Sequence, residues 1–193
     1  MKLYEHLPDH VMVRGRKVRL DLDFRNVLRM IDILMQDDLT DEAREWLAMR
    51  CICKHPVKGM MYPVKKLLFP QVGKKETKDR IMDYTQDADM IRAAFQQAYG
   101  IDLYRDKLHW FRFSCLLSCL PENTRYSDVL SIRARPIPNP TKYNTEERNW
   151  LIQAKAKVKI QLSEKEIAKR YQQDVSNIAA VLMGMAGGSE NNG

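Results

Sequence analysis

The sequence contains no long apolar run. None of its hydrophobic stretches approaches the ~20 residues that a membrane-spanning helix needs. The beginning of the chain carries Glu5 and Asp9 and lacks the apolar core of a signal peptide, so we expect a protein that stays in the cytoplasm and does not enter a membrane. Cysteine is also scarce, with 4 residues in 193. In a cytoplasmic protein this scarcity argues against a disulfide framework.

Recognisable catalytic and metal-binding signatures are missing as well. There is no G-x-x-x-x-G-K-[ST] or G-x-G-x-x-G loop, no G-x-S-x-G elbow and no H-E-x-x-H motif. Cys51 and Cys53 stand two positions apart, which on a helix points them roughly 200° away from each other. Cys115 and Cys119 share a helix face, but that face is apolar, where a free cysteine acts as a small hydrophobe. The cysteines therefore do not predict a zinc site.

Two groups of polar residues are explained more simply by structural roles than by catalysis or metal binding. His109 stands beside Trp110 with no nucleophile at a readable spacing, so we expect a hydrogen-bonded histidine in the core or at its rim. Asp87-x-Asp89 could hold a cation, but the pair marks a helix start, where capping and the helix dipole account for both acids. We therefore expect a protein that is not an enzyme and that needs neither a cofactor nor a metal.

What the sequence does have is an excess of basic residues, 32 against 25 acidic ones, for a net charge of +7. The excess is local: residues 50–80 hold nine basic and two acidic residues, whereas the rest of the chain holds 23 of each. Such a stretch attracts phosphates, acidic proteins or anionic lipid. A solvated basic loop explains the same residues, and we prefer it in the absence of a nucleic-acid motif.

Hydrophobic periodicity predicts a mainly α protein: a compact helical domain with a small N-terminal β-hairpin and a C-terminal helical extension. Apolar residues between Val11 and Leu22 alternate around Arg14-Gly15, which is typical of a hairpin. The helix that starts at Thr40 carries the apolar residues Ala43, Trp46, Leu47 and Cys51. Segment 106–120 is apolar around most of its circumference, as in a central buried helix. Further helices are predicted over 23–37 with Asp23 as N-cap, 64–69, 88–99 with Gly100 as C-cap, and about 126–133.

The sharpest boundary in the chain is rich in proline. Pro136, Pro138 and Pro140 remove amide donors and favour extended geometry. We therefore divide the chain into a helical core domain with the hairpin over 1–135, a linker over 136–143, a helical extension over 144–185 and a disordered tail over 186–193.

Two segments are candidates for binding a partner. A pair of methionines stands beside lysines in the basic stretch, and flexible thioethers suit adaptable binding surfaces. The predicted contact residues are Lys58, Met60, Met61, Lys65 and Lys66. The segment 162–182 is similar to a helix-turn-helix, but its turn has Gln172 where glycine is usual and its charges nearly balance. Binding of nucleic acid is therefore kept as an alternative and is not the preferred prediction.

Three runs of residues carry a family resemblance. They are Asp83-Tyr84-x-x-Asp87 leading to Ala93-Ala94-Phe95, Tyr99-Gly100-Ile101-Asp102-Leu103, and Leu108-His109-Trp110 leading to Leu116-Leu117. Ser131-Ile132-Arg133 and the hairpin before Asp23-Phe24-Arg25 extend the likeness over most of residues 10–135. With these runs the chain resembles the gene-product-fifteen family of tailed bacteriophages that infect Gram-positive bacteria.

The resemblance implies a helper protein encoded just before the tape-measure gene. Such a protein is expected to act in the host bacterial cytoplasm as a non-enzymatic tail-assembly chaperone. Its implied partners are the tape-measure protein, which is a long helical chain with exposed apolar stripes, and a companion tail-assembly protein. The resemblance carries no catalytic residues. A minor structural component of the virion is the alternative within the same phage context.

Overall fold

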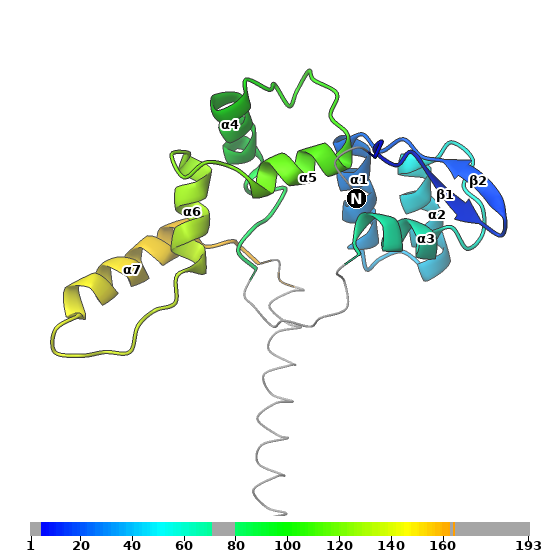
Figure 1. The fold of residues 1–193 in the computed structure, drawn as a ribbon. Helices are drawn as coiled ribbons and strands as arrows, with labels where there is room; N and C mark the ends of the chain where they lie inside the picture. The colour runs from blue at the N-terminus through cyan, green and yellow to red at the C-terminus, as the bar shows by residue number, and fades with distance from the viewer. Residues whose placement is uncertain (1–4, 71–79, 163, 165–193) are drawn as a thin grey trace, which may run out of the picture.

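The structure is a computed structural model that describes residues 5–70, 80–162 and 164 (Figure 1). Within these residues the chain forms helices and one two-stranded antiparallel sheet, so the predicted mainly α fold is confirmed. The hairpin and the first three helices lie at one end, α4 and α5 in the middle, and α6 and α7 at the other end (Figure 1). The elements are β1 (His10–Val13), β2 (Arg16–Arg19), α1 (Phe24–Leu34), α2 (Asp41–Ile52), α3 (Met61–Leu68), α4 (Ala88–Tyr99), α5 (Trp110–Ser118), α6 (Arg125–Ala134) and α7 (Thr145–Val158).

The predicted hairpin is confirmed, and its turn explains the glycine. Val13 pairs with Arg16, which leaves Arg14 and Gly15 as a two-residue connection. Both connecting residues have positive φ, +48° and +78°. This is the backbone of a type I′ turn, whose twist matches that of the strands it joins and whose second position favours glycine. Val11 and Val13 are buried, so the inner side of β1 belongs to the core.

The predicted helix caps occupy their expected positions. The Asp23 carboxylate accepts a hydrogen bond of 3.0 Å from the Arg25 amide and begins α1. The Thr40 hydroxyl accepts one of 3.3 Å from the Ala43 amide and begins α2. Gly100 ends α4 with a φ of +66°, the left-handed conformation that glycine adopts without strain. Local side-chain chemistry therefore sets where these helices begin and end.

The expectation of a helix buried on most sides is wrong for α5. The helix begins at Trp110 and buries one face, formed by Trp110, Phe113 and Leu117. Arg112 and Cys115 are exposed, because α5 lies across the neighbouring helices and its other face meets solvent. The apolar appearance of segment 106–120 arises partly from Leu108, which is buried in the loop before the helix.

α2 packs on α1 through residues other than its large aromatic. Its buried residues are Ala48, Met49 and Ile52. Trp46 is 55% exposed, and the guanidinium of Arg50 lies 5.5 Å from the centre of its ring. The most hydrophobic side chain of this helix therefore lies on the surface, partly covered by a neighbouring cation.

The ring of Phe113 lies at the centre of the core. Its centroid is 4.6 Å from that of Phe24, 5.3 Å from that of Phe95 and 5.9 Å from that of Trp110, so one residue joins α1, α4 and α5. Ring pairs of this kind contribute about 0.5–1.5 kcal/mol each beyond their buried area. The Trp110 amide also donates a hydrogen bond of 2.7 Å to the Leu22 carbonyl, which ties the start of α5 to the segment before α1.

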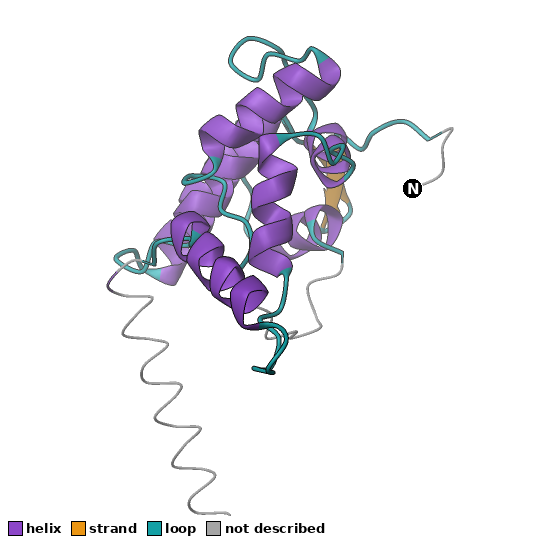
Figure 2. Cartoon of the chain, turned by 90° about the vertical axis from the view of Figure 1, so that its left-hand side faces the viewer, coloured by secondary structure: helices purple, strands orange, loops and turns teal. Residues whose placement is uncertain are grey.

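α7 packs against α6 and ends well before the predicted limit of the helical extension. Leu151 is its buried residue, and Ile160 just beyond the helix is buried too. Residues 136–140 are exposed and without regular structure, and residues 159–162 are not helical. Figure 2, viewed from the end that carries α7, shows the two strands behind the helices. The four-part division of the chain stays a prediction, and segment 165–193 lies outside the described residues.

Candidate partner-binding surface

A buried ion pair connects two of the runs that carry the family resemblance. The Arg133 guanidinium donates two hydrogen bonds to the Asp87 carboxylate, at 2.7 and 2.9 Å. The Asp87 side chain is 1% exposed and that of Arg133 is 10% exposed. Arg133 also donates to the Ile81 carbonyl at 3.0 Å and to the Val158 carbonyl at 2.6 Å. One guanidinium therefore holds α6, the segment before α4 and the end of α7 together.

Asp83 completes this polar network. Its carboxylate accepts hydrogen bonds from the Thr85 and Gln86 amides at 2.8 and 2.9 Å, and its own amide donates to Asp87 at 3.0 Å. It also forms an ion pair of 2.6 Å with Arg80. The two aspartates of the Asp83-Tyr84-x-x-Asp87 run thus fix the shape of the loop before α4.

The structural role found for Asp87 differs from the expected one. Its carboxylate does not cap α4 and instead pairs with Arg133, while Asp89 pairs on the surface with Arg92 at 2.8 Å. The Tyr126 hydroxyl is buried near this network and has no hydrogen-bond partner among the described residues. Burial, followed by the charge of Asp87, raises the pKa of Tyr126 far above its usual value, so the phenol is neutral.

His109 is satisfied by hydrogen bonds, as the sequence predicted. It precedes α5, and its Nδ1 accepts a bond of 3.3 Å from the Phe111 amide. Its Nε2 lies 3.1 Å from the Pro8 carbonyl. Because Nδ1 accepts, Nε2 carries the proton and donates to Pro8. Both ring nitrogens are therefore used in holding the N-terminal segment against α5.

The cysteines do not gather into one site. Cys53 is buried and Cys51 is half-buried, whereas Cys115 and Cys119 are exposed on and just after α5. The expected burial of Cys115 and Cys119 on an apolar face is therefore wrong. Within the described ranges, no three side chains of the His, Cys, Asp or Glu type lie close enough to hold a metal ion.

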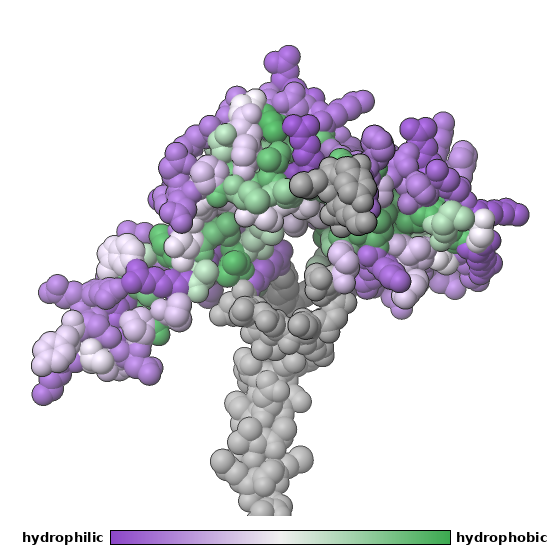
Figure 3. All heavy atoms as spheres, viewed as in Figure 1, coloured by the Kyte–Doolittle hydropathy of each residue, from purple (hydrophilic) through white to green (hydrophobic). Residues whose placement is uncertain are grey.

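The five predicted contact residues divide between core and surface. Met60 directly precedes α3 and is fully buried in the core, so it cannot contact a partner in this conformation. Met61 is half-buried, and Lys58, Lys65 and Lys66 are exposed. Apolar surface borders hydrophilic side chains at the end of the molecule that carries the hairpin (Figure 3). A binding role for the four accessible residues stays a prediction.

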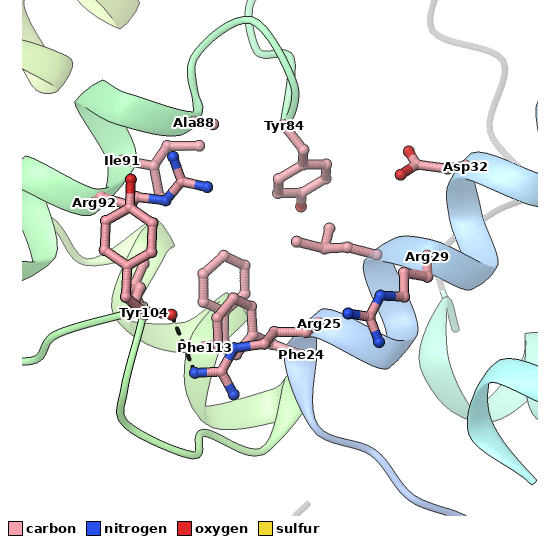
Figure 4. A pocket seen from close by; sticks show the side chains of 12 residues that line it. Phe24, Arg25, Arg29, Asp32, Tyr84, Ala88, Ile91, Arg92, Tyr104 and Phe113 are labelled. Carbon is pink, nitrogen blue, oxygen red and sulfur yellow. Dashed lines mark hydrogen bonds between the residues drawn. The ribbon is translucent and has the colours of Figure 1, made fainter.

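An open cleft of about 400 Å³ lies between α1 and α4 (Figure 4). Phe24 and Phe113 form its aromatic floor, and Tyr84 hangs from the loop before α4 with its ring pointing into the opening. Burial raises the pKa of the Tyr84 phenol, so its hydroxyl stays neutral. The remaining walls are formed by Arg25, Leu28, Arg29, Asp32, Ala88, Ile91, Arg92, Leu103 and Tyr104.

The arginines of the cleft are largely occupied by groups of the protein itself. Arg25 pairs with Asp23 at 3.1 Å and donates to two backbone carbonyls of the loop before α5. Arg92 pairs with Asp89, and its guanidinium lies 4.4 Å from the ring centre of Tyr104. Burial, with a smaller contribution from Asp83, raises the pKa of Asp32. The cleft therefore offers apolar and aromatic surface with nearly balanced charge, which suits an apolar side chain better than an ion.

Sequence reasoning missed this cleft, although parts of it stand in the runs that carry the resemblance. Phe24-Arg25 and Tyr84 stand in those runs, but nothing in the sequence alone gives them a role. The floor residue Phe113 stands in segment 106–120, for which the sequence predicts a buried helix, and its ring does pack in the core. Hydrophobic periodicity does not predict that α1, α4 and two loops meet at one opening. The helix-turn-helix-like segment 162–182 falls almost wholly outside the described residues, as do the lysines of segment 71–79.

Among the helices in the described ranges, none is both long and apolar enough to cross a membrane. No curated protein and no solved structure shows significant similarity to the chain. A family model described as Bacteriophage Gp15 protein matches residues 3–160. This range contains every helix and strand described above, including the Asp87–Arg133 pair and the walls of the cleft. The chain belongs to the bacteriophage Gp15 protein family.

Proposed function

We propose that this phage protein acts in tail morphogenesis as a non-enzymatic assembly chaperone of the tape-measure protein. Two arguments support the proposal. The chain belongs to the Gp15 family, and its resemblance to proteins encoded just before the tape-measure gene implies a role in tail assembly. The observation that carries the proposal is the open, aromatic-floored cleft between α1 and α4.

A chaperone of a long helical protein has to cover apolar stripes reversibly. A helix presents such a stripe through side chains at i, i+3 and i+4, and an apolar groove receives them. Leu28, Tyr84 and Tyr104 give the cleft accessible surface of this kind above the buried rings of Phe24 and Phe113, and its volume of about 400 Å³ accommodates one or two large side chains. Burying one such side chain contributes about 1.5–3 kcal/mol. A few side chains buried in this way give an affinity weak enough for the tail-tube subunits to displace the chaperone.

Co-expression with the tape-measure protein tests the proposal. Ala88 lines the cleft and is half-buried, so Ala88→Leu fills the opening without disturbing the helix. Ala93→Leu places the same side chain on an exposed position of α4 away from the cleft and serves as the matched control. We expect the unaltered chain and Ala93→Leu to keep the tape-measure protein soluble and to co-purify with it, and Ala88→Leu to fail.

Two results would contradict the proposal. One is a tape-measure protein whose solubility does not change when this chain is co-expressed. The other is an equal loss of co-purification with Ala88→Leu and Ala93→Leu, which would place the contact elsewhere. Mass spectrometry of purified particles separates a chaperone, which is absent from finished phage, from a structural component of the virion.

A further inference from the structure

A second opening, of about 580 Å³, lies between β1 and α3 at the other end of the molecule from α7. Most residues in its walls are apolar. Two of these residues are largely exposed to solvent: Met12 is 56% exposed and Tyr62 is 75% exposed. Because Val11 and Val13 are buried on either side of Met12, the strand turns this methionine outward. The walls are formed by Val11, Met12, Val13, Arg14, Gly59, Tyr62, Pro63, Lys66 and Leu67.

The groove carries charge of one sign. Its two charged wall residues are Arg14 and Lys66, and within the described ranges neither forms a salt bridge. The segments around it continue the pattern, since residues 10–19 and residues 54–69 each contain four lysines or arginines and no acid. Of the acids nearby, Asp9 is paired with His10 at 2.9 Å, and Glu42 lies with Lys58 in a separate hollow.

The groove gives a structural context to the basic stretch of the sequence. Of the basic residues in 50–80, Lys66 lies in the α3 bank of the groove, and Lys65 is exposed on the same helix. The hairpin supplies the other bank through Arg14. Arg16 and Lys17 are exposed on the same hairpin, and the sequence-wide count had hidden these cations because acids elsewhere balance them. The fold therefore brings two acid-free segments, forty to fifty positions apart, together around an apolar groove with one cation on each bank.

We propose that the groove between β1 and α3 binds an acidic peptide segment of a partner protein, with an apolar side chain of that segment seated between Met12 and Tyr62. Charge complementarity identifies the occupant: Arg14 on one bank and Lys66 on the other, which form no salt bridge within the described ranges, attract carboxylates and steer their approach. The apolar walls select a protein segment over a nucleic acid, because single strands are held by several aromatic platforms and Tyr62 is the one aromatic in the walls. The proposal does not depend on the α1–α4 cleft or on the chaperone role.

Fluorescence anisotropy with labelled synthetic peptides tests this binding on the full chain. The probes are a peptide that repeats glutamate and leucine, the same peptide with lysine in place of glutamate, and an oligothymidylate. We expect the glutamate peptide to bind, and we expect added salt to weaken it because the attraction is electrostatic. Lys66→Glu and Tyr62→Gln should each weaken binding by about tenfold, since the first reverses a wall charge and the second removes an exposed anchor.

Matched controls distinguish binding in the groove from nonspecific electrostatic attraction to the protein. Arg112→Glu makes the same charge change at an exposed site on α5, and Tyr143→Gln removes a tyrosine that is 98% exposed at the end of the linker. Both should bind the glutamate peptide as the unaltered chain does. The proposal is overturned if Arg112→Glu weakens binding as much as Lys66→Glu, if the lysine peptide binds equally, or if oligothymidylate binds more tightly with the same dependence on Lys66 and Tyr62. No binding of the glutamate peptide at low salt also overturns it and leaves the tape-measure experiment unaffected.

Discussion

The Asp87–Arg133 pair shows how one polar contact holds together parts of the chain that lie 46 positions apart. Both side chains are nearly inaccessible to water, and the guanidinium also binds two backbone carbonyls. A buried pair of this kind depends on both partners, because a single buried charge without its counterpart is costly. Its effect on stability should therefore differ sharply from that of an ion pair on the surface.

Replacing Arg133 tests this difference. Arg133→Met leaves the Asp87 carboxylate buried and unpaired, and we expect the free energy of unfolding to fall by about 3–5 kcal/mol. Arg135→Met is the matched control, because Arg135 and its partner Glu147 are both about half exposed. This second change should cost less than about 1 kcal/mol. Urea denaturation measures both values, and equal values would contradict the structural role given to Arg133.

Tyr126 leads to the opposite expectation. Its hydroxyl is buried without a partner among the described residues, so Tyr126→Phe should leave stability at neutral pH within about 1 kcal/mol of the unaltered protein. At high pH the two proteins should diverge. Burial and Asp87 raise the pKa of Tyr126 in the folded state, while in the unfolded state it titrates near 10.0.

Above that pH the unfolded chain loses the phenolic proton and the folded chain keeps it, so stability falls as the pH rises. Tyr126→Phe removes this contribution, and its stability should decline less above pH ~10. Denaturation curves at neutral and alkaline pH measure the effect. An identical alkaline decline in both proteins would contradict the assignment.

Among the elements, the hairpin depends most clearly on a single backbone conformation. Gly15 has a φ of +78°, and no neighbouring atom lies within 4 Å of the place where a Cβ would stand. The strain of Gly15→Ala therefore comes from the backbone alone, and we expect a loss of about 1 kcal/mol. Gly15→Asn should cost less, because asparagine tolerates positive φ better than alanine. Thermal unfolding of the two variants measures the difference, and equal losses would exclude a backbone cause.

α7 is held by few contacts, of which Leu151 is the buried apolar one. Leu151→Ala should cost about 2–5 kcal/mol of local stability, as other large-to-small changes in cores do. Ile152→Ala alters the neighbouring residue, which is 38% exposed, and should have a much smaller effect. Hydrogen exchange of the α7 amides reports the change. Faster exchange throughout α1–α5 as well would show that α7 does not open separately.

What could be predicted from the sequence depends on how local its cause is. Asp23, Thr40 and Gly100 act within one helical turn, so their caps follow from the residue type and its position. The burial expected around most of segment 106–120 was wrong because burial depends on which helices pack nearby; Trp46 and Cys115 are exposed although their types favour burial. Neither the Asp87–Arg133 pair nor the two openings have a sequence signature, since each joins segments that only the fold brings together.

For the molecule as a whole, the two openings differ in their chemistry. The α1–α4 cleft offers aromatic surface with nearly balanced charge, and the groove between β1 and α3 offers apolar walls with a cation on each bank. A chaperone that uses both could cover an apolar stripe at one place and hold an acidic segment at another, which raises affinity without a very strong single contact. The cleft carries the proposed function.

Hydrogen exchange of this chain alone and in complex with the tape-measure protein tests the central claim most directly. If the cleft covers an apolar stripe of that protein, amides in residues 24–32 and 84–92 should exchange more slowly in the complex, and Ala88→Leu should abolish this protection. A complex that forms while these amides exchange as they do in the free chain would contradict the account.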